Sequence, residues 1–409
     1  MKAAGFWGNY FKLTGRFSPN AKRYLLATFL ISVGFSFYGV LFNLYLNEGG
    51  LQEGIIGSIL SLSGLALVVT AIPAGILSDR LGRKKAMIIG TLSGALLSIL
   101  RALTVNGPGL LSLSFLGGVA STLYVLSAAP FMMENSRPEE RTHLFSASFA
   151  VMLAAGIVGN LLAGGLPGWV MNVFGSSTFA AYRFSLLLGS GIFLSALWPL
   201  FKITQTPIIT DDSSLVSLKR LGQGFRAAGG FVWCNFWIGL GAGLVIPFFN
   251  LYFAKRFGAS SVQIGLYFSV SQIFTLAAVL VGPALAKRFG KVRTVVVMEL
   301  LSLPFLISLG AEKILYLAVL SFWMRASLMQ MSSPISSAFM MEIVPDDARA
   351  TVNSIATMAW NLSWTFSTAF SGWAMQRYGY AMPYYLTAGC YAVSAVSFYL
   401  LYNKKEPGR

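Results

Sequence analysis

The chain of 409 residues is 56% hydrophobic and only 11% charged, with a mean hydropathy of +0.68. Soluble domains carry about 25% charged residues, so this composition excludes a water-soluble protein and indicates an integral membrane protein. In a soluble domain, the net charge of +16 would suggest nucleic-acid binding. In a membrane protein, the cations must first be assigned to one face of the bilayer.

Apolar runs long enough to cross about 30 Å of hydrocarbon recur along the whole chain. We predict twelve transmembrane helices, near residues 24–47, 54–78, 86–104, 109–133, 143–171, 178–201, 228–254, 262–286, 293–310, 314–340, 350–375 and 382–402. These runs are continuous and lack the alternation of an outer-membrane barrel strand. The predicted fold is therefore an all-α integral membrane bundle.

Lysine and arginine are concentrated in the N-terminal arm, in alternate connections and in the C-terminal tail. The intervening connections hold only Lys255, Arg256, Lys313 and Arg377. The positive-inside rule then places both termini and the basic loops in the cytoplasm, in a multi-pass protein of the inner (cytoplasmic) membrane. The basic excess is a topology signal, and we expect no nucleic-acid partner. A full-length helix follows the N-terminal arm, so that arm does not look like a cleavable signal peptide.

Sequence motifs of the first half of the chain return in the second half. LFNLYL at 41–46 recurs as FFNLYF at 248–253, and FMMENSRPEER at 131–141 recurs as FMMEIVPDDAR at 339–349. Further pairs share one offset: Gly57 and Gly265, Arg80 and Arg288, Gly82 and Gly290, Glu134 and Glu342, Arg141 and Arg349. The chain is therefore predicted to consist of two homologous halves.

Each half of the repeat contains six predicted helices. An even number gives both halves the same orientation in the bilayer, a plan known among transporters with the binding site between the halves. We predict an N-terminal six-helix half at 1–202, a cytoplasmic linker at 203–226 and a C-terminal six-helix half at 227–409.

The stretch GILSDRLGRKK, residues 75–85, joins the second and third predicted helices. It resembles the signature loop of the major facilitator superfamily (MFS), and the E-x6-R spacing after the fourth and tenth helices matches sugar porters of that superfamily. The resemblance covers essentially the whole chain. It implies the MFS fold and a secondary active transporter that works by alternating access. In character the chain resembles bacterial drug/proton antiporters, although GIVGNLLAGG at 156–165 departs from their antiporter motif.

The charged loops predict a latch on the cytoplasmic side. Asp79 can cap or pair at a helix end, Arg83 can reach Glu134, and Gly82 permits a tight turn. In the family, such networks hold the halves together when the cavity faces outward. The expected conformational gate consists of Asp79, Arg80, Gly82, Arg83, Lys84, Glu134, Arg141, Arg288, Glu342 and Arg349. Lys287 stands at the position equivalent to Asp79, so we expect an asymmetric latch. The alternative is that these cations serve only topology.

The resemblance implies a central cavity lined by the first, fourth, seventh and tenth helices. Polar stripes on transmembrane helices avoid lipid. Arg325 lies near mid-membrane, where a permanently charged guanidinium is costly unless it is paired or hydrated. We interpret it as an anion anchor or counter-ion; the alternative is structural pairing with helix carbonyls. The predicted substrate-binding residues are Ser36, Asn43, Gln272, Asn235, Asn250, Arg325 and Ser332.

Three acids are candidates for proton coupling: Glu299, Asp79 and Glu134. Glu299 lies about two turns into the ninth predicted helix, which is peripheral in the family. The leading functional hypothesis is export of a small amphipathic organic compound by proton antiport. The alternatives are uptake or exchange of an organic anion held by Arg325, and a receptor of the same fold that binds ligand without transporting it.

The sequence offers little support for an enzyme or a cofactor. It has one histidine, two cysteines within apolar segments and no Walker-type nucleotide loop. We therefore expect no catalytic residues, no metal and no cofactor. The expected partners are a small-molecule substrate, protons and the lipid bilayer, and we expect a monomer.

Overall fold

The computed structural model describes residues 17–204, 218–344 and 349–404. Regular structure in this part of the chain is helical, which confirms the predicted all-α fold. Most of the N-terminal arm and of the predicted linker lie outside the described residues. The first group of helices comprises α2 (Pro19–Glu48), α3 (Glu53–Leu81), α4 (Arg83–Leu103), α5 (Gly107–Glu134), α6 (Pro138–Phe174), α7 (Thr178–Ser195) and α8 (Leu197–Phe201).

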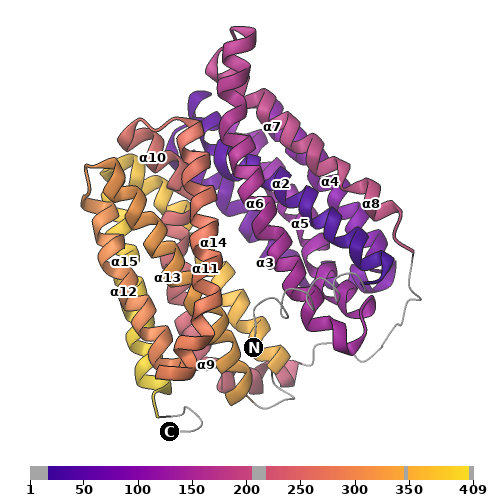
Figure 1. The fold of residues 1–409 in the computed structure, drawn as a ribbon, viewed down its shortest axis with the longest axis vertical. Coiled ribbons are helices and arrows are strands. Elements are labelled where there is room, and N and C mark those ends of the chain that lie inside the picture. Colours follow the sequence, from indigo (N-terminus) through magenta and orange to yellow (C-terminus); the bar gives the residue numbers. More distant parts are fainter. Residues whose placement is uncertain (1–16, 205–217, 345–348, 405–409) are drawn as a thin grey trace, which may run out of the picture.

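A second group follows the linker, and Figure 1 shows it in orange and yellow beside the indigo and magenta helices of the first group. It comprises α9 (Leu218–Val245), the 3₁₀ turn η2 (Ile246–Phe248), α10 (Phe249–Phe257), α11 (Ser261–Phe289), α12 (Lys291–Ala311), α13 (Leu315–Ile343), α14 (Arg349–Tyr378) and α15 (Ala381–Tyr402). Among the described residues, ten spans are long and apolar enough to cross a membrane. The spans α13 and α14 fall outside that set although they are as long, because they are more polar.

Each of the twelve predicted spans is helical, but two are interrupted. The span predicted at 228–254 breaks at η2, because Pro247 has no N–H to donate back to the preceding turn. The carbonyls of Gly243 and Leu244 are satisfied instead by α14, where the Thr368 hydroxyl donates to Gly243 O at 3.2 Å and the Ser371 hydroxyl donates to Leu244 O. The span predicted at 178–201 is divided between α7 and α8.

The predicted tight turn at Gly82 is a single residue between α3 and α4. Gly82 has φ +83°, and its repeat partner Gly290 has φ +88° between α11 and α12. Side chains other than glycine rarely adopt this region, which explains the glycine at both positions. We call the end of the bundle that carries these two turns the basic end, and the opposite end the far end.

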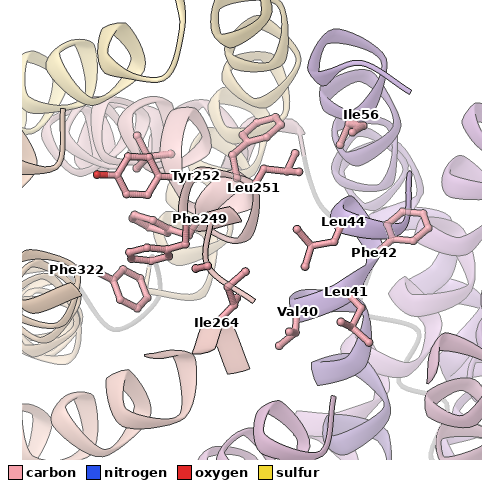
Figure 2. Packing of buried hydrophobic residues seen from close by; sticks show 14 of the residues in the cluster. Val40, Leu41, Phe42, Leu44, Ile56, Phe249, Leu251, Tyr252, Ile264 and Phe322 are labelled. Atoms are coloured by element: carbon pink, nitrogen blue, oxygen red, sulfur yellow. The ribbon is translucent and has the colours of Figure 1, made fainter. Parts of the chain in front are cut away.

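The two groups of helices share one apolar core toward the far end. Figure 2 shows α2 side chains, such as Val40 and Leu44, facing the side that holds Phe249, Ile264 and Phe322 of the second group. Toward the basic end this core divides in two. One cluster contains Tyr24, Met87, Phe131 and Leu144 of the first group. The other contains Phe231, Val292, Phe339 and Phe398 of the second group.

Candidate functional site

A cavity of about 660 Å³ lies against the second group of helices, which is a volume typical of sites for small organic ligands. Its wall comes from α9 to α15, with Asn160 of α6 as the contribution of the first group. Four helices were expected to line the cavity. The seventh predicted helix (α9 with α10) and the tenth (α13) do so, whereas the first (α2) and the fourth (α5) contribute no residue to this wall. Its polar lining residues include Asn235, Ser271, Gln272, Thr275, Glu299, Arg325, Gln330, Ser332, Ser333, Ser336, Ser337, Asn353 and Thr357.

Arg325 of α13 brings a buried cation to the cavity wall. Its side chain is 4% exposed, and its Nη2 donates a hydrogen bond to Tyr391 Oη at 2.7 Å. The guanidinium carbon lies 5.6 Å from the ring centroid of Phe249 and 5.7 Å from that of Tyr391. Nε of Arg325 is buried and has no hydrogen-bond partner among the described residues. The guanidinium is thus held by aromatic rings and one hydroxyl, and its Nε–H remains available to donate a hydrogen bond to a ligand.

Aromatic rings supply much of the remaining wall. Trp360 and Trp364 of α14 lie with ring centroids 4.9 Å apart, and both line the cavity. The Phe322 ring on α13 packs edge-on against Phe249 at 4.7 Å and lies 5.6 Å from Phe268. Such rings provide broad apolar contact for a flat or ring-bearing ligand.

The polar residues of α13 form a face around Pro334. The run SSPISS places Ser332, Ser333, Ser336 and Ser337 on the cavity wall. Ser332 donates its hydroxyl hydrogen to Met329 O at 2.8 Å, within its own helix. These hydroxyls retain acceptor capacity toward a ligand.

Asn235 and Gln272, two of the predicted substrate-binding residues, also lie in the cavity wall. Asn235 Nδ2 donates to Phe231 O at 2.9 Å, which leaves its amide oxygen available. Gln272 lies beside α6, since a Cβ atom at Gly156 would come within 3.2 Å of its Nε2.

The three other predicted substrate-binding residues lie outside this cavity wall. Asn43 Nδ2 donates to Asn250 Oδ1 at 2.9 Å and to Pro247 O at 2.7 Å, and Asn250 Nδ2 donates to Val40 O at 3.1 Å. Both asparagines join α2 to α10 within the shared core. Ser36 donates to Ser32 O at 2.9 Å and packs against Gly159 of α6.

Glu299 of α12 also reaches the cavity wall, although its helix was expected to be peripheral. The residue is 2% exposed, and its Oε2 has no hydrogen-bond partner among the described residues. Asp79 and Glu134, the two other proton-coupling candidates, are partly exposed at the basic end.

The predicted contact between Arg83 and Glu134 is present. Arg83 Nε lies 3.3 Å from Glu134 Oε1, and its Nη1 pairs with Asp79 and donates to Ser78 Oγ at 3.0 Å. At the equivalent positions of the repeat, Lys291 pairs with Glu342. These ion pairs each lie within one group of helices, so in this conformation they do not join the two groups at the basic end.

The other predicted gate residues are placed around the same two loops. Arg80 is exposed and Lys84 is half-buried. Arg288 lies over the ring of Phe289 at 5.2 Å, and Arg349 Nε donates to Val344 O at 3.2 Å. Nε of Arg141 is buried without a partner among the described residues. Whether these residues act as a gate stays a prediction.

Comparison with known protein families identifies the architecture. The sequence profile of the Major Facilitator Superfamily matches residues 24–222 and 231–409, which is nearly the whole chain. The chain belongs to the major facilitator superfamily. It is a multi-pass membrane protein of a family of transporters.

Two sequence relatives of this MFS chain have different functional names. A gallate transporter of Pseudomonas putida is 28% identical over 155 residues, which is 38% of this chain and 32% of that protein. The multidrug resistance protein MdtH of Aeromonas salmonicida (strain A449) is 25% identical over 189 residues, which is 44% of this chain and 45% of that protein. The alignments therefore span less than half the length of either relative.

Solved structures show the same MFS fold. The nucleoside transporter NupG superposes with a TM-score of 0.74 at 18% identity, covering 94% of this chain and 99% of NupG. A D-xylose-proton symporter gives 0.74 at 16% identity, with 93% and 97% covered. A bacterial homologue of the lysosomal transporter Spinster, in an inward-facing and occupied conformation, gives 0.74 at 14% identity, with 94% and 96% covered.

The two helix groups of this MFS fold meet through two equivalent helix pairs. Gly57 of α3 lies against α14, where an added Cβ would come within 3.0 Å of Gly372 Cα. Gly164 of α6 lies against α11, where an added Cβ would come within 3.0 Å of Gly265 Cα. Gly57 with Gly265, and Gly164 with Gly372, share one sequence offset, so the repeat is visible in the packing.

Sequence analysis missed Tyr391 and Trp364 as members of the site. Tyr391 comes from the middle of α15, and its hydroxyl holds Arg325. A tyrosine in the middle of an apolar span was the available signal, because a buried phenol requires a hydrogen-bond partner. Among the described residues, no cluster of His, Cys, Asp and Glu side chains that would hold a metal ion is found.

Proposed function

We propose that this protein carries a small, ring-bearing organic anion across the cytoplasmic membrane by alternating access, with Arg325 as the anion anchor. The observation that carries the proposal is the buried guanidinium on the cavity wall, with aromatic rings beside it and no partner for its Nε among the described residues. A planar guanidinium with free donors suits a carboxylate. Similarity to a gallate transporter supports the same substrate class.

The direction in which the cavity faces follows from the topology that we propose. Lysine and arginine gather in the loops of the basic end, which the positive-inside rule assigns to the cytoplasm together with both termini. The shared apolar core then closes the outer side, and the division of the core at the basic end corresponds to an inward-facing state. The ionic latch would form in the opposite state.

The second candidate is export of an amphipathic compound by proton antiport. The aromatic wall formed by Phe249, Phe322, Trp360 and Trp364 favours it, as does the similarity to a multidrug resistance protein. In this candidate Glu299, which lines the cavity, binds the proton, with Asp79 and Glu134 as alternatives at the basic end.

Counterflow in proteoliposomes tests both candidates. Cationic, neutral and anionic aromatic compounds are compared with and without a pH gradient, in the wild type, Arg325→Gln and Glu299→Gln. Anion flux should fall at least tenfold in Arg325→Gln, on the order of one charge-assisted contact. Arg101→Gln is the matched control, because Arg101 is a half-buried arginine 5.5 Å from the Phe42 ring but lies outside the cavity wall.

The same assay separates the remaining alternatives. Intact anion flux in Arg325→Gln would exclude the anchor. Full gradient dependence in Glu299→Gln would exclude Glu299 as the proton site. Ligand binding without counterflow of any compound would favour a receptor of the same fold.

A further inference from the structure

Two buried residues that bear opposite charges when ionised line the same cavity. Arg325 on α13 is 4% exposed and Glu299 on α12 is 2% exposed. They do not form an ion pair, because their nitrogen and oxygen atoms lie more than 4.0 Å apart. Each keeps a polar atom without a partner among the described residues, Nε of Arg325 and Oε2 of Glu299.

Tyr391 lines the cavity together with both groups and holds one of them. Its hydroxyl accepts a hydrogen bond from Arg325 Nη2 at 2.7 Å, and Tyr391 lines the same cavity as Glu299. The guanidinium and the carboxyl are thus two separate polar points on the wall of one cavity. A ligand that carries two polar groups can contact both points.

The need to pair both side chains indicates which kind of ligand would contact both Arg325 and Glu299. Arginine stays protonated in proteins, and a buried charge without a partner is costly. A simple anion pairs with Arg325 but leaves Oε2 of Glu299 without a partner among the described residues, and a simple cation leaves the Arg325 guanidinium without a counter-charge. A molecule with one acidic group and one amine satisfies both side chains at once.

We propose that the substrate is a zwitterionic amino compound with an aromatic ring, whose acidic group contacts Arg325 and whose amine contacts Glu299. This inference rests on the proposed anion anchor and adds the second contact. The ring packs against the aromatic wall around Phe249, Phe322 and Trp360. A volume of about 660 Å³ accepts a compound with a single ring.

Three probes with the same ring and side-chain length test the inference by calorimetry on the purified full chain. Phenylalanine carries both charges, 3-phenylpropionate only the negative one, and phenethylamine only the positive one. Phenylalanine should bind about tenfold more tightly than either of the others, which corresponds to one additional charge-assisted contact.

Two variants assign the contacts. Glu299→Gln should weaken phenylalanine about tenfold and leave 3-phenylpropionate unchanged, whereas Arg325→Gln should weaken both acids and spare phenethylamine. Glu312→Gln is the control, because Glu312 is an acid just after the end of α12 and lies outside the cavity wall. Ratios between probes are compared within each variant, so a partial loss of folded protein does not alter them.

The outcomes separate this inference from the proposed function. Equal binding of phenylalanine and 3-phenylpropionate in the wild type, or an unchanged ratio in Glu299→Gln, overturns the zwitterion and leaves the anchor standing. Unchanged binding of 3-phenylpropionate in Arg325→Gln overturns the anchor as well. Absence of binding by all three probes overturns the aromatic zwitterion as the substrate class.

Discussion

Asn43 and Asn250 occupy equivalent positions of the sequence repeat and hydrogen-bond to each other across the two helix groups. Each is almost fully buried, and their amides also satisfy backbone carbonyls of the opposite group. A polar residue inside a membrane protein was expected to line a cavity, but a partner on another helix satisfies it equally well. The pair therefore closes the far end in this conformation.

Asn43→Ala should destabilise this closed far end. The change leaves Pro247 O without its donor at 2.7 Å and Asn250 Oδ1 with one donor fewer, a cost of about 1–3 kcal/mol for buried groups. The midpoint of thermal unfolding in detergent should fall by several degrees. Asn47→Ala is the control, because Asn47 donates only within its own segment, to Leu51 O at 3.2 Å. Equal shifts in the two variants would contradict a role in closure.

Ion pairs at the basic end should matter more for the transport cycle than for stability. Arg83 with Glu134, and Lys291 with Glu342, are partly exposed, and exposed pairs contribute about 0–1 kcal/mol. We expect Glu342→Gln to shift the unfolding midpoint little and to slow transport clearly. The charge swap that combines Lys291→Glu with Glu342→Lys should restore the rate. A large loss of stability with normal flux would contradict this prediction.

At the scale of elements, close approach of helix backbones joins the two groups. The α6–α11 contact has room for hydrogen only, because a Cβ at Gly164 would lie 2.6 Å from Ser261 O, which is backbone. Ser261 in turn donates its hydroxyl to Gly164 O at 3.0 Å. Small residues allow this geometry in membranes, where van der Waals packing and hydrogen bonds hold helices together.

Gly164→Ala should separate α6 from α11. Overpacking against rigid backbone costs about 1–3 kcal/mol, so both the unfolding midpoint and the transport rate should fall. The adjacent Gly165→Ala is a matched control, because a Cβ there would meet no atom within 4 Å. The two variants add the same methyl group one residue apart. If both lose transport to the same extent, the tight contact is not the cause.

Sequence patterns predicted the helices well because each transmembrane span must satisfy its own backbone within one apolar run. The spans at 54–78 and 86–104 correspond to α3 and α4 within a few residues, and the glycine between them predicted the turn. The break at Pro247 was not predicted, because a proline within a span is compatible with a kinked continuous helix.

The site itself was predicted only in part. Four of the predicted residues line the cavity: Arg325, Asn235, Gln272 and Ser332. They could be predicted because charged and polar residues in the middle of a membrane span are recognisable in the sequence. Tyr391 was missed because its contact with Arg325 depends on how α13 and α15 align, which no local pattern encodes. The conformation was not predictable either, because one sequence specifies every state of the cycle.

On the scale of the whole molecule, alternating access requires that the far end opens when the basic end closes. At the far end the structure holds α3 against α14, where Gly54 N donates to Gln376 Oε1 at 3.2 Å, and against the start of α15, where Tyr380 Oη donates to Glu53 Oε1 at 3.0 Å. A covalent bond at this position should therefore stop the cycle without disturbing the conformation seen here.

Gly54→Cys with Trp373→Cys provides that bond. A Cβ at Gly54 would lie 3.8 Å from Trp373 Cα, which is compatible with a Cα separation of about 4.4–6.8 Å for a disulfide. In a background with Cys234 and Cys390 replaced by alanine, oxidation should reduce counterflow to background, and dithiothreitol should restore it. Each single cysteine variant should be insensitive to the oxidant. Undiminished transport by the fully cross-linked protein would show that substrate crosses without separation of α3 from α14, which contradicts a rocking motion of the two helix groups.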